Sequence, residues 1–110
     1  MNSDFVIKTT DSFDKSVKKL LKKYPSFRQD LLHLKAMLLK NPVAGISLGK
    51  DCYKIRLRIA SKQSGKSGGA RVITYVKIEK KNITLLDVYD KADKESISEK
   101  DLAALIKKAG

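Results

Sequence analysis

Cations and branched apolar residues alternate one by one from Lys54 to Ile59. Because successive side chains of a β-strand point to opposite faces, this pattern gives a strand two different faces. One face carries Lys54, Arg56 and Arg58, and the other carries Ile55, Leu57 and Ile59. Like charges side by side repel one another, so the pattern predicts a strand with one face in the core and the other turned to an anionic ligand.

A second strand is expected from Arg71 to Glu79, after a loop of Gly, Ser and Lys residues numbered 62–69. A loop of this composition predicts a surface position with backbone amides accessible to phosphate. If the two strands form a hairpin, Arg71 joins the cations of the first strand. The stretch from Cys52 to Val76 then forms one basic surface.

The remaining elements are indicated by helical spacing, capping residues and breakers. We expect a strand at 5–9, a helix from Phe13 to Tyr24 behind the cap residues 10–12, a second helix from Phe27 to Leu38 capped by Ser26, a loop at 43–50, a turn at 80–82, a strand at 83–89 and a last helix from Ser98. The order β-α-α-β-β-β-α predicts an α+β fold. A small, mainly antiparallel sheet has the helical hairpin packed on one face and is followed by a C-terminal helix.

The 110 residues are expected to form a single domain, 1–110. The net charge is +12, and residues 50–81 hold ten of the cations and two of the acids. Such a concentration of positive charge favours a polyanionic partner. With one cysteine, no signal-peptide pattern and no apolar run of membrane-spanning length, we expect a cytoplasmic protein that does not bind membranes.

Several familiar site chemistries do not fit the pattern. Residues 64–67 resemble a P-loop only superficially, because Ala60 stands where its first glycine is needed and a strand follows. His33 and Cys52 lack further ligands at metal spacing, so a half-buried helix residue and a buried or incidental thiol are the favoured interpretations, and no metal or cofactor is expected. Hydrolase triads and carboxylate pairs are missing as well.

The candidate side chains that remain are lysine, arginine and tyrosine, and their chemistry is suited to binding phosphate. Neighbouring cations disfavour the charged form of Lys54, which favours this residue as a general base. Arg56 and Arg71 keep their charge and suit the stabilisation of a phosphorane-like transition state.

The motif residues resemble the RelE/HigB branch of toxins from type II toxin–antitoxin modules. The similarity is carried by Asp51 to Arg58 (DCYKIRLR), Gly69, Arg71 to Tyr75 (RVITY) and Leu85 to Lys91. It implies a ribosome-dependent endoribonuclease that cuts mRNA in the A site without a metal, leaving a 2′,3′-cyclic phosphate. It also implies a cognate antitoxin, and it assigns catalysis to Lys54, Arg56 and Arg71.

The sequence departs from the RelE pattern near its end, where Ala92 and Ser98 replace an arginine and a tyrosine. Tyr89, Lys91 or Lys94 could supply these roles. Tyr89 is equally a candidate for base stacking and for the core at a strand end. We further expect RNA binding by Arg58, Lys62 and Lys66.

Two alternatives remain open. The missing arginine and tyrosine favour a non-nuclease toxin of the ParE kind, which acts on DNA gyrase. The overall charge alone is compatible with a non-enzymatic basic RNA-binding protein. The lysines between positions 15 and 23 are better explained as a solvated helix face than as a nucleic-acid surface, although both could hold.

Overall fold

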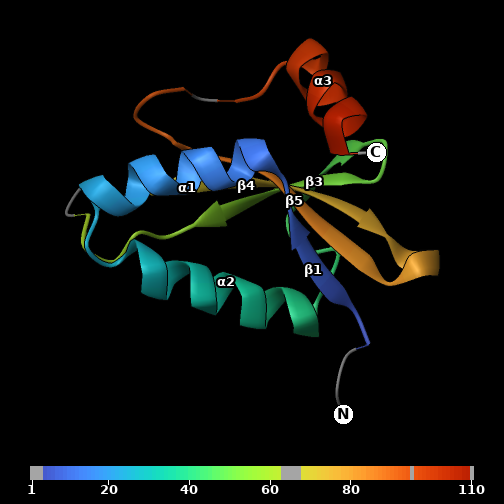
Figure 1. The fold of residues 1–110 in the computed structure, drawn as a ribbon, viewed down its shortest axis with the longest axis horizontal. Helices are drawn as coiled ribbons and strands as arrows, with labels where there is room; N and C mark the ends of the chain where they lie inside the picture. Colours follow the sequence, from blue (N-terminus) through green and yellow to red (C-terminus); the bar gives the residue numbers. More distant parts are fainter. Residues whose placement is uncertain (1–3, 63–67, 95, 110) are drawn as a thin grey trace.

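The computed structural model describes residues 4–62, 68–94 and 96–109, which form one five-stranded sheet with three α-helices (Figure 1). The elements are β1 (Val6–Thr9), α1 (Asp11–Lys23), α2 (Phe27–Lys40), β2 (Ile46–Gly49), β3 (Cys52–Leu57), β4 (Ala70–Lys77), a 3₁₀ turn (Ile78–Lys80), β5 (Asn82–Asp90) and α3 (Glu99–Ala109). The strands lie in the order β1-β5-β4-β3-β2. The predicted α+β class and the hairpin of β3 and β4 are confirmed.

The sheet departs from the expectation at both of its edges. β1 pairs in parallel with β5, so the sheet is mixed, whereas the other pairings are antiparallel. The loop expected at 43–50 is wrong in part, because Ile46–Gly49 pairs with β3 as the edge strand β2. This strand is short and mostly exposed, so its identity depends on pairing with β3 rather than on a local pattern.

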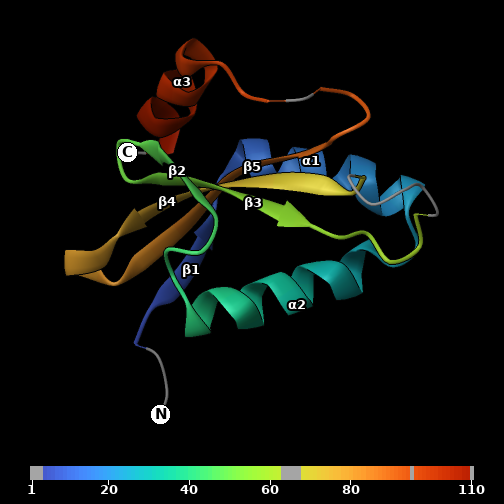
Figure 2. The same cartoon turned by 180° about the vertical axis from the view of Figure 1, so that it is seen from behind.

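The two faces of the sheet carry separate apolar clusters. The larger cluster joins α1 and α2 to the sheet through Phe13, Leu20, Phe27, Leu34, Leu38, Ile55, Leu57, Val72, Leu85 and Val88, among others. The smaller one joins α3 to the sheet through Cys52, Ile73, Leu86, Tyr89 and Leu102. In both views α3 stands apart from the α1–α2 pair (Figures 1 and 2). The helical hairpin therefore covers one face, and α3 covers only part of the other.

A one-residue bulge in β5 changes which residues of the strand face each cluster. Ile73 pairs with Asp87 and Thr74 pairs with Leu85, which leaves Leu86 as the additional residue. Leu85 and Leu86 are both fully buried, in the larger and the smaller cluster respectively. Ile83 and Leu85 face the larger cluster before the bulge, and Val88 faces it after the bulge, so the alternation is shifted by one residue.

Two of the three predicted helix caps, Thr10 and Ser98, are confirmed. Thr10 Oγ1 accepts from the Phe13 amide at 3.1 Å and donates to the Leu86 carbonyl at 3.1 Å, which ties α1 to β5. Ser98 Oγ accepts from the Asp101 amide at 3.1 Å. The prediction for Ser26 is wrong, because its side chain makes no capping bond to α2 and instead donates to Asp30 at 2.7 Å.

Replacing Gly69 by alanine is expected to destabilise the fold by about 2 kcal/mol or more. Gly69 has a φ of +88°, and an added Cβ would lie 2.5 Å from the Leu57 carbonyl oxygen. Gly49→Ala is the matched control, because Gly49 has a φ of +80° with open space around the added atom. Urea unfolding should show the larger loss for Gly69→Ala, and equal losses would contradict the steric explanation.

Candidate functional site

The alternation in β3 is confirmed by burial. Ile55 and Leu57 are 4% and 7% exposed, whereas Arg56 is exposed and Lys54 is half-buried on the opposite face. β3 ends at Leu57, so Arg58 follows the strand as an exposed residue. Lys54 and Arg56 therefore share the face that α3 covers only in part.

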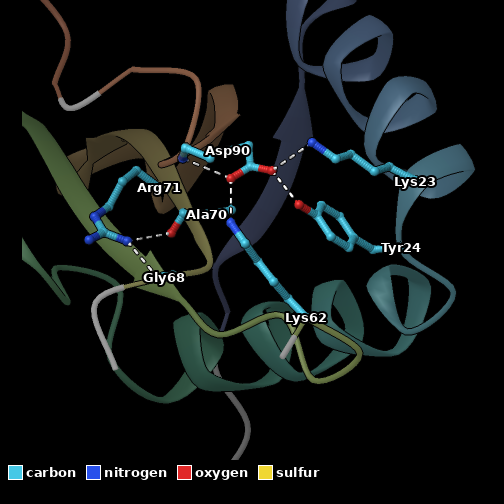
Figure 3. Close-up of polar contacts among 8 residues, drawn as sticks. Lys23, Tyr24, Lys62, Gly68, Ala70, Arg71 and Asp90 are labelled. Carbon is cyan, nitrogen blue, oxygen red and sulfur yellow. Dashed lines mark hydrogen bonds and ion pairs between the residues drawn. The ribbon is translucent and has the colours of Figure 1, made fainter. Parts of the chain in front are cut away.

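Arg71 joins this face through the register of the hairpin. It pairs directly with Arg56 across β3 and β4. Arg71 is 5% exposed, and its guanidinium donates to the carbonyls of Gly68 at 3.4 Å and Ala70 at 3.2 Å (Figure 3). These contacts hold the guanidinium close to the start of β4, so Arg71 is a more constrained cation than Arg56.

A pocket of about 340 Å³ brings the predicted catalytic residues together. The described residues that line it are Ile46, Lys54, Arg56, Arg71, Lys91 and Ser96. Four of these six are cations, drawn from β3, from β4 and from the segment after β5. Such a concave cluster suits an anionic group that is held from several sides.

Tyr89 and Lys94 occupy a different environment. Tyr89 is 8% exposed and packs in the smaller apolar cluster, and among the described residues its hydroxyl has no hydrogen-bond partner. Burial raises the pKa of Tyr89, which the nearby Arg71 opposes. The exposed Lys94 places its ammonium group 4.7 Å from the centre of the Tyr89 ring. This placement favours Tyr89 as a core residue at a strand end over Tyr89 as a platform for base stacking.

Lys62 forms an ion pair with the buried carboxylate of Asp90, which was not predicted as a site residue. Lys62 Nζ lies 2.7 Å from Asp90 Oδ1, and Asp90 is 2% exposed. Asp90 also accepts from the Tyr24 hydroxyl at 2.5 Å, from Lys23 at 3.5 Å and from the Ala92 amide at 2.9 Å (Figure 3). Lys66, predicted beside Lys62, lies outside the described residues.

These bonds decide the charge of Asp90. Burial opposes ionisation, but the hydrogen bonds from Lys62, Tyr24 and the Ala92 amide outweigh it and hold the pKa of Asp90 well below its usual range. The bond to Asp90 in turn raises the pKa of Lys62, against the opposing effect of burial. The pair is therefore ionised at neutral pH.

The contribution of Asp90 to the free energy of unfolding is expected to be lost in acid. Its folded pKa lies below the unfolded value of about 3.9, so the stabilisation is complete above about pH 5 and is lost as the pH falls toward the folded value. Urea unfolding of wild type and Asp90→Asn should differ by about 2–3 kcal/mol at pH 7, and this difference should shrink progressively as the pH falls below about 4 toward the folded pKa. The exposed Asp93→Asn should stay within about 0.5 kcal/mol of wild type. A gap between wild type and Asp90→Asn that persists in acid would contradict the charge-based explanation.

Other candidate groups behave as inert parts of the fold. Cys52 is fully buried, and burial raises the pKa of its thiol to about 11. His33 lies on α2, as predicted, but it is exposed rather than half-buried. Within the described ranges, no group of three His, Cys, Asp or Glu side chains could hold a metal ion, and no helix is long and apolar enough to cross a membrane.

Three residues of the site region were not predicted from the sequence. Ile46 and Ser96 line the pocket, but Ile46 lies on an unpredicted edge strand and Ser96 in an irregular segment, and neither carries a local signal. Asp90 did carry one, because it is an acid at the end of a largely apolar strand and directly precedes Lys91. Its partners Tyr24 and Lys62 are too distant in sequence to be identified from that signal.

Comparison with known proteins finds a matching family model and similar solved structures. A family model described as the RelE toxin of the RelE/RelB toxin–antitoxin system matches residues 39–110. A double arginine-to-alanine mutant of E. coli toxin RelE in the free state is 20% identical, with a TM-score of 0.59 over 94% of this chain and 95% of that one. A chain of the intact E. coli RelBE toxin–antitoxin complex is 24% identical, with a TM-score of 0.57 over 76% and 93%. A search of curated proteins finds no match. At these identities the two structures support the fold alone.

Proposed function

Because this chain belongs to the RelE family of toxins from toxin–antitoxin systems, we propose that it is a ribosome-dependent mRNA endoribonuclease that inhibits translation. The observation that carries this proposal is the convergence of Lys54, Arg56, Arg71 and Lys91 on one pocket. Cations around a concave site bind the RNA backbone and stabilise charge that develops on a phosphate.

The proposed reaction is an attack of the ribose 2′-hydroxyl on the adjacent phosphate. Lys54 accepts the hydroxyl proton as the 2′-oxygen bonds to phosphorus, and the bond from phosphorus to the 5′-oxygen breaks. Arg56 and Arg71 balance the negative charge on the phosphate oxygens. Lys91 donates a proton to the leaving 5′-oxygen, and the products are a 2′,3′-cyclic phosphate and a 5′-hydroxyl. Every step is assigned to a protein side chain, so the proposed reaction needs no metal ion.

Lys91 is the preferred candidate for the proton donor. Of the three residues considered for this role, it is the one among those described that lines the pocket, whereas Tyr89 is buried beneath α3 and Lys94 lies over the Tyr89 ring. Ala92 is exposed, and Ser98 serves as a cap of α3. The proton-donor role that Ala92 and Ser98 leave open is thus assigned to Lys91.

The apolar part of the pocket points to a nucleotide rather than to a free phosphate. Ile46 is 66% exposed and pairs with Lys54 from the neighbouring strand. An apolar side chain beside a cation can contact a base or ribose while the cation contacts the backbone. We propose that Ile46 contacts the nucleotide next to the scissile phosphate.

Inducible expression with sequencing of mRNA 5′ ends tests the proposed function. Wild type should produce codon-phased cuts with 5′-hydroxyl ends, and these should disappear in Arg71→Ala. Intact messages together with DNA damage would instead indicate a gyrase poison of the ParE kind. Expression without any effect on growth would indicate a non-enzymatic RNA-binding protein.

A neighbouring antitoxin is the expected protein partner, as in the E. coli RelBE complex to which the fold is similar. An acidic or amphipathic segment that folds on binding could cover the cations or displace α3, whose described contacts involve one side of the helix. Purification from the native operon should recover such a small protein. Recovery of the toxin alone would count against this partner.

A further inference from the structure

We propose that Asp90 is a positioning residue that holds Lys91 and the two ends of the β3–β4 connection in place around the pocket. This role rests on the proposed endoribonuclease function. Asp90 itself does not line the pocket among the described residues, but it directly precedes Lys91, which does. It also pairs with Ala70 in the β4–β5 ladder, next to Arg71.

The turn that contains Lys91 is closed by Asp90. The carboxylate accepts from the Ala92 amide at 2.9 Å, and the Asp90 carbonyl accepts from the Asp93 amide at 2.9 Å. Lys91 lies inside this turn, and its own amide donates to the Gly69 carbonyl at 3.0 Å. The backbone on both sides of Lys91 is thereby restrained, which limits the directions in which its side chain can point.

The same carboxylate holds the other end of the connection. Lys62, in the β3-side half of the connection, lies 2.7 Å from Asp90, and its side chain is 13% exposed. At the opposite end, the carbonyls of Gly68 and Ala70 accept from Arg71. Figure 3 shows the Asp90 carboxylate facing Lys62, with the Tyr24 hydroxyl and Lys23 approaching from the end of α1. A shift of Asp90 would therefore displace Lys91 and the base of the connection together.

A carboxylate at this position suits a positioning role rather than direct contact with phosphate. An anion beside a phosphate pocket weakens phosphate binding, and here two lysines offset its charge at 2.7 and 3.5 Å. Removing the negative charge should leave RNA affinity unchanged or improve it, whereas loss of the turn should lower the rate of cleavage. The maximal rate is thus expected to fall without a rise in the toxin concentration needed for half-saturation.

The test compares Asp90→Asn with Asp93→Asn. Both variants remove one negative charge, at positions three residues apart. Asp93 is exposed, however, and its side chain takes no part in the hydrogen bonds and ion pairs of the Asp90 carboxylate. Single-turnover cleavage on mRNA-programmed ribosomes gives a maximal rate and a half-saturating toxin concentration. Asp90→Asn should lower the maximal rate about tenfold or more, with an equal or lower half-saturating concentration. Asp93→Asn should leave both constants within about twofold of wild type.

Amide hydrogen exchange supplies a readout that does not depend on activity. Exchange at Lys91 and Ala92 should become faster in Asp90→Asn and stay unchanged in Asp93→Asn. If Asp90→Asn does not fold, Tyr24→Phe removes one hydrogen bond to Asp90 and should show a smaller change of the same kind.

The possible results separate this role from the proposed function. An unchanged maximal rate in Asp90→Asn, or a loss seen only as a higher half-saturating concentration, would overturn the positioning role and leave the proposed function standing. A wild-type protein that leaves ribosome-bound mRNA intact would overturn the proposed function and the role that depends on it.

Discussion

Arg71→Ala is expected to lower the single-turnover rate of mRNA cleavage by about 10²–10³-fold, the effect of removing one preorganised donor to a developing charge. Arg71 pairs with Arg56 and lines the pocket, while its guanidinium is restrained by the carbonyls of Gly68 and Ala70. A donor held in place before the reaction stabilises the transition state more than the ground state. The loss should therefore appear in the maximal rate, with little change in the toxin concentration needed for half-saturation.

The control for this variant is Arg28→Ala. Arg28 is exposed on α2, which packs against the opposite face of the sheet, and its loss changes the net charge by the same amount. Its cleavage rate should remain within about twofold of wild type. Arg71→Lys keeps the charge but loses the forked geometry, so an intermediate loss is expected. Equal rates for Arg71→Ala and Arg28→Ala would show that only the total charge matters.

The parts of the fold that could be predicted are those with a local periodic signal. The alternation in β3 and the apolar stripes of α1 and α2 each specify a face, and those faces are buried as expected. Strand β2 could not be predicted, since its four residues are largely exposed and become a strand only by pairing with β3. The parallel pairing of β1 with β5 likewise depends on contacts between segments that lie far apart in the sequence.

The candidate site shows the same division between local and distant information. The proximity of Arg56 and Arg71 follows from the hairpin, so it was predictable from the two strands. The placement of Lys62 was not, because its partner Asp90 lies 28 residues further along the chain. Tyr89 remained open between two interpretations, since only the packing of α3 decides whether its ring is covered. The roles of these residues in RNA binding and catalysis stay predictions.

Lys54 and Arg56 allow the sharpest test of the mechanism, because each can be replaced by the residue type of the other. Both lie on the same face of β3 and line the same pocket. Lys54→Arg keeps the positive charge but removes the group that accepts a proton, so a loss of about 10²–10⁴-fold in the maximal rate is expected. Arg56→Lys keeps the charge that its role requires and should lose about tenfold or less.

The dependence of the rate on pH distinguishes proton transfer from charge stabilisation at Lys54. If Lys54 is the general base, the wild-type rate should depend on pH, and the same dependence should persist in Arg56→Lys. Lys54→Arg should lose this dependence along with most of its activity, because arginine does not deprotonate in the accessible range. If Lys54→Arg instead cleaves mRNA at the wild-type rate with the same pH profile, Lys54 acts only as a charge, and the base must be supplied by the ribosome or the RNA.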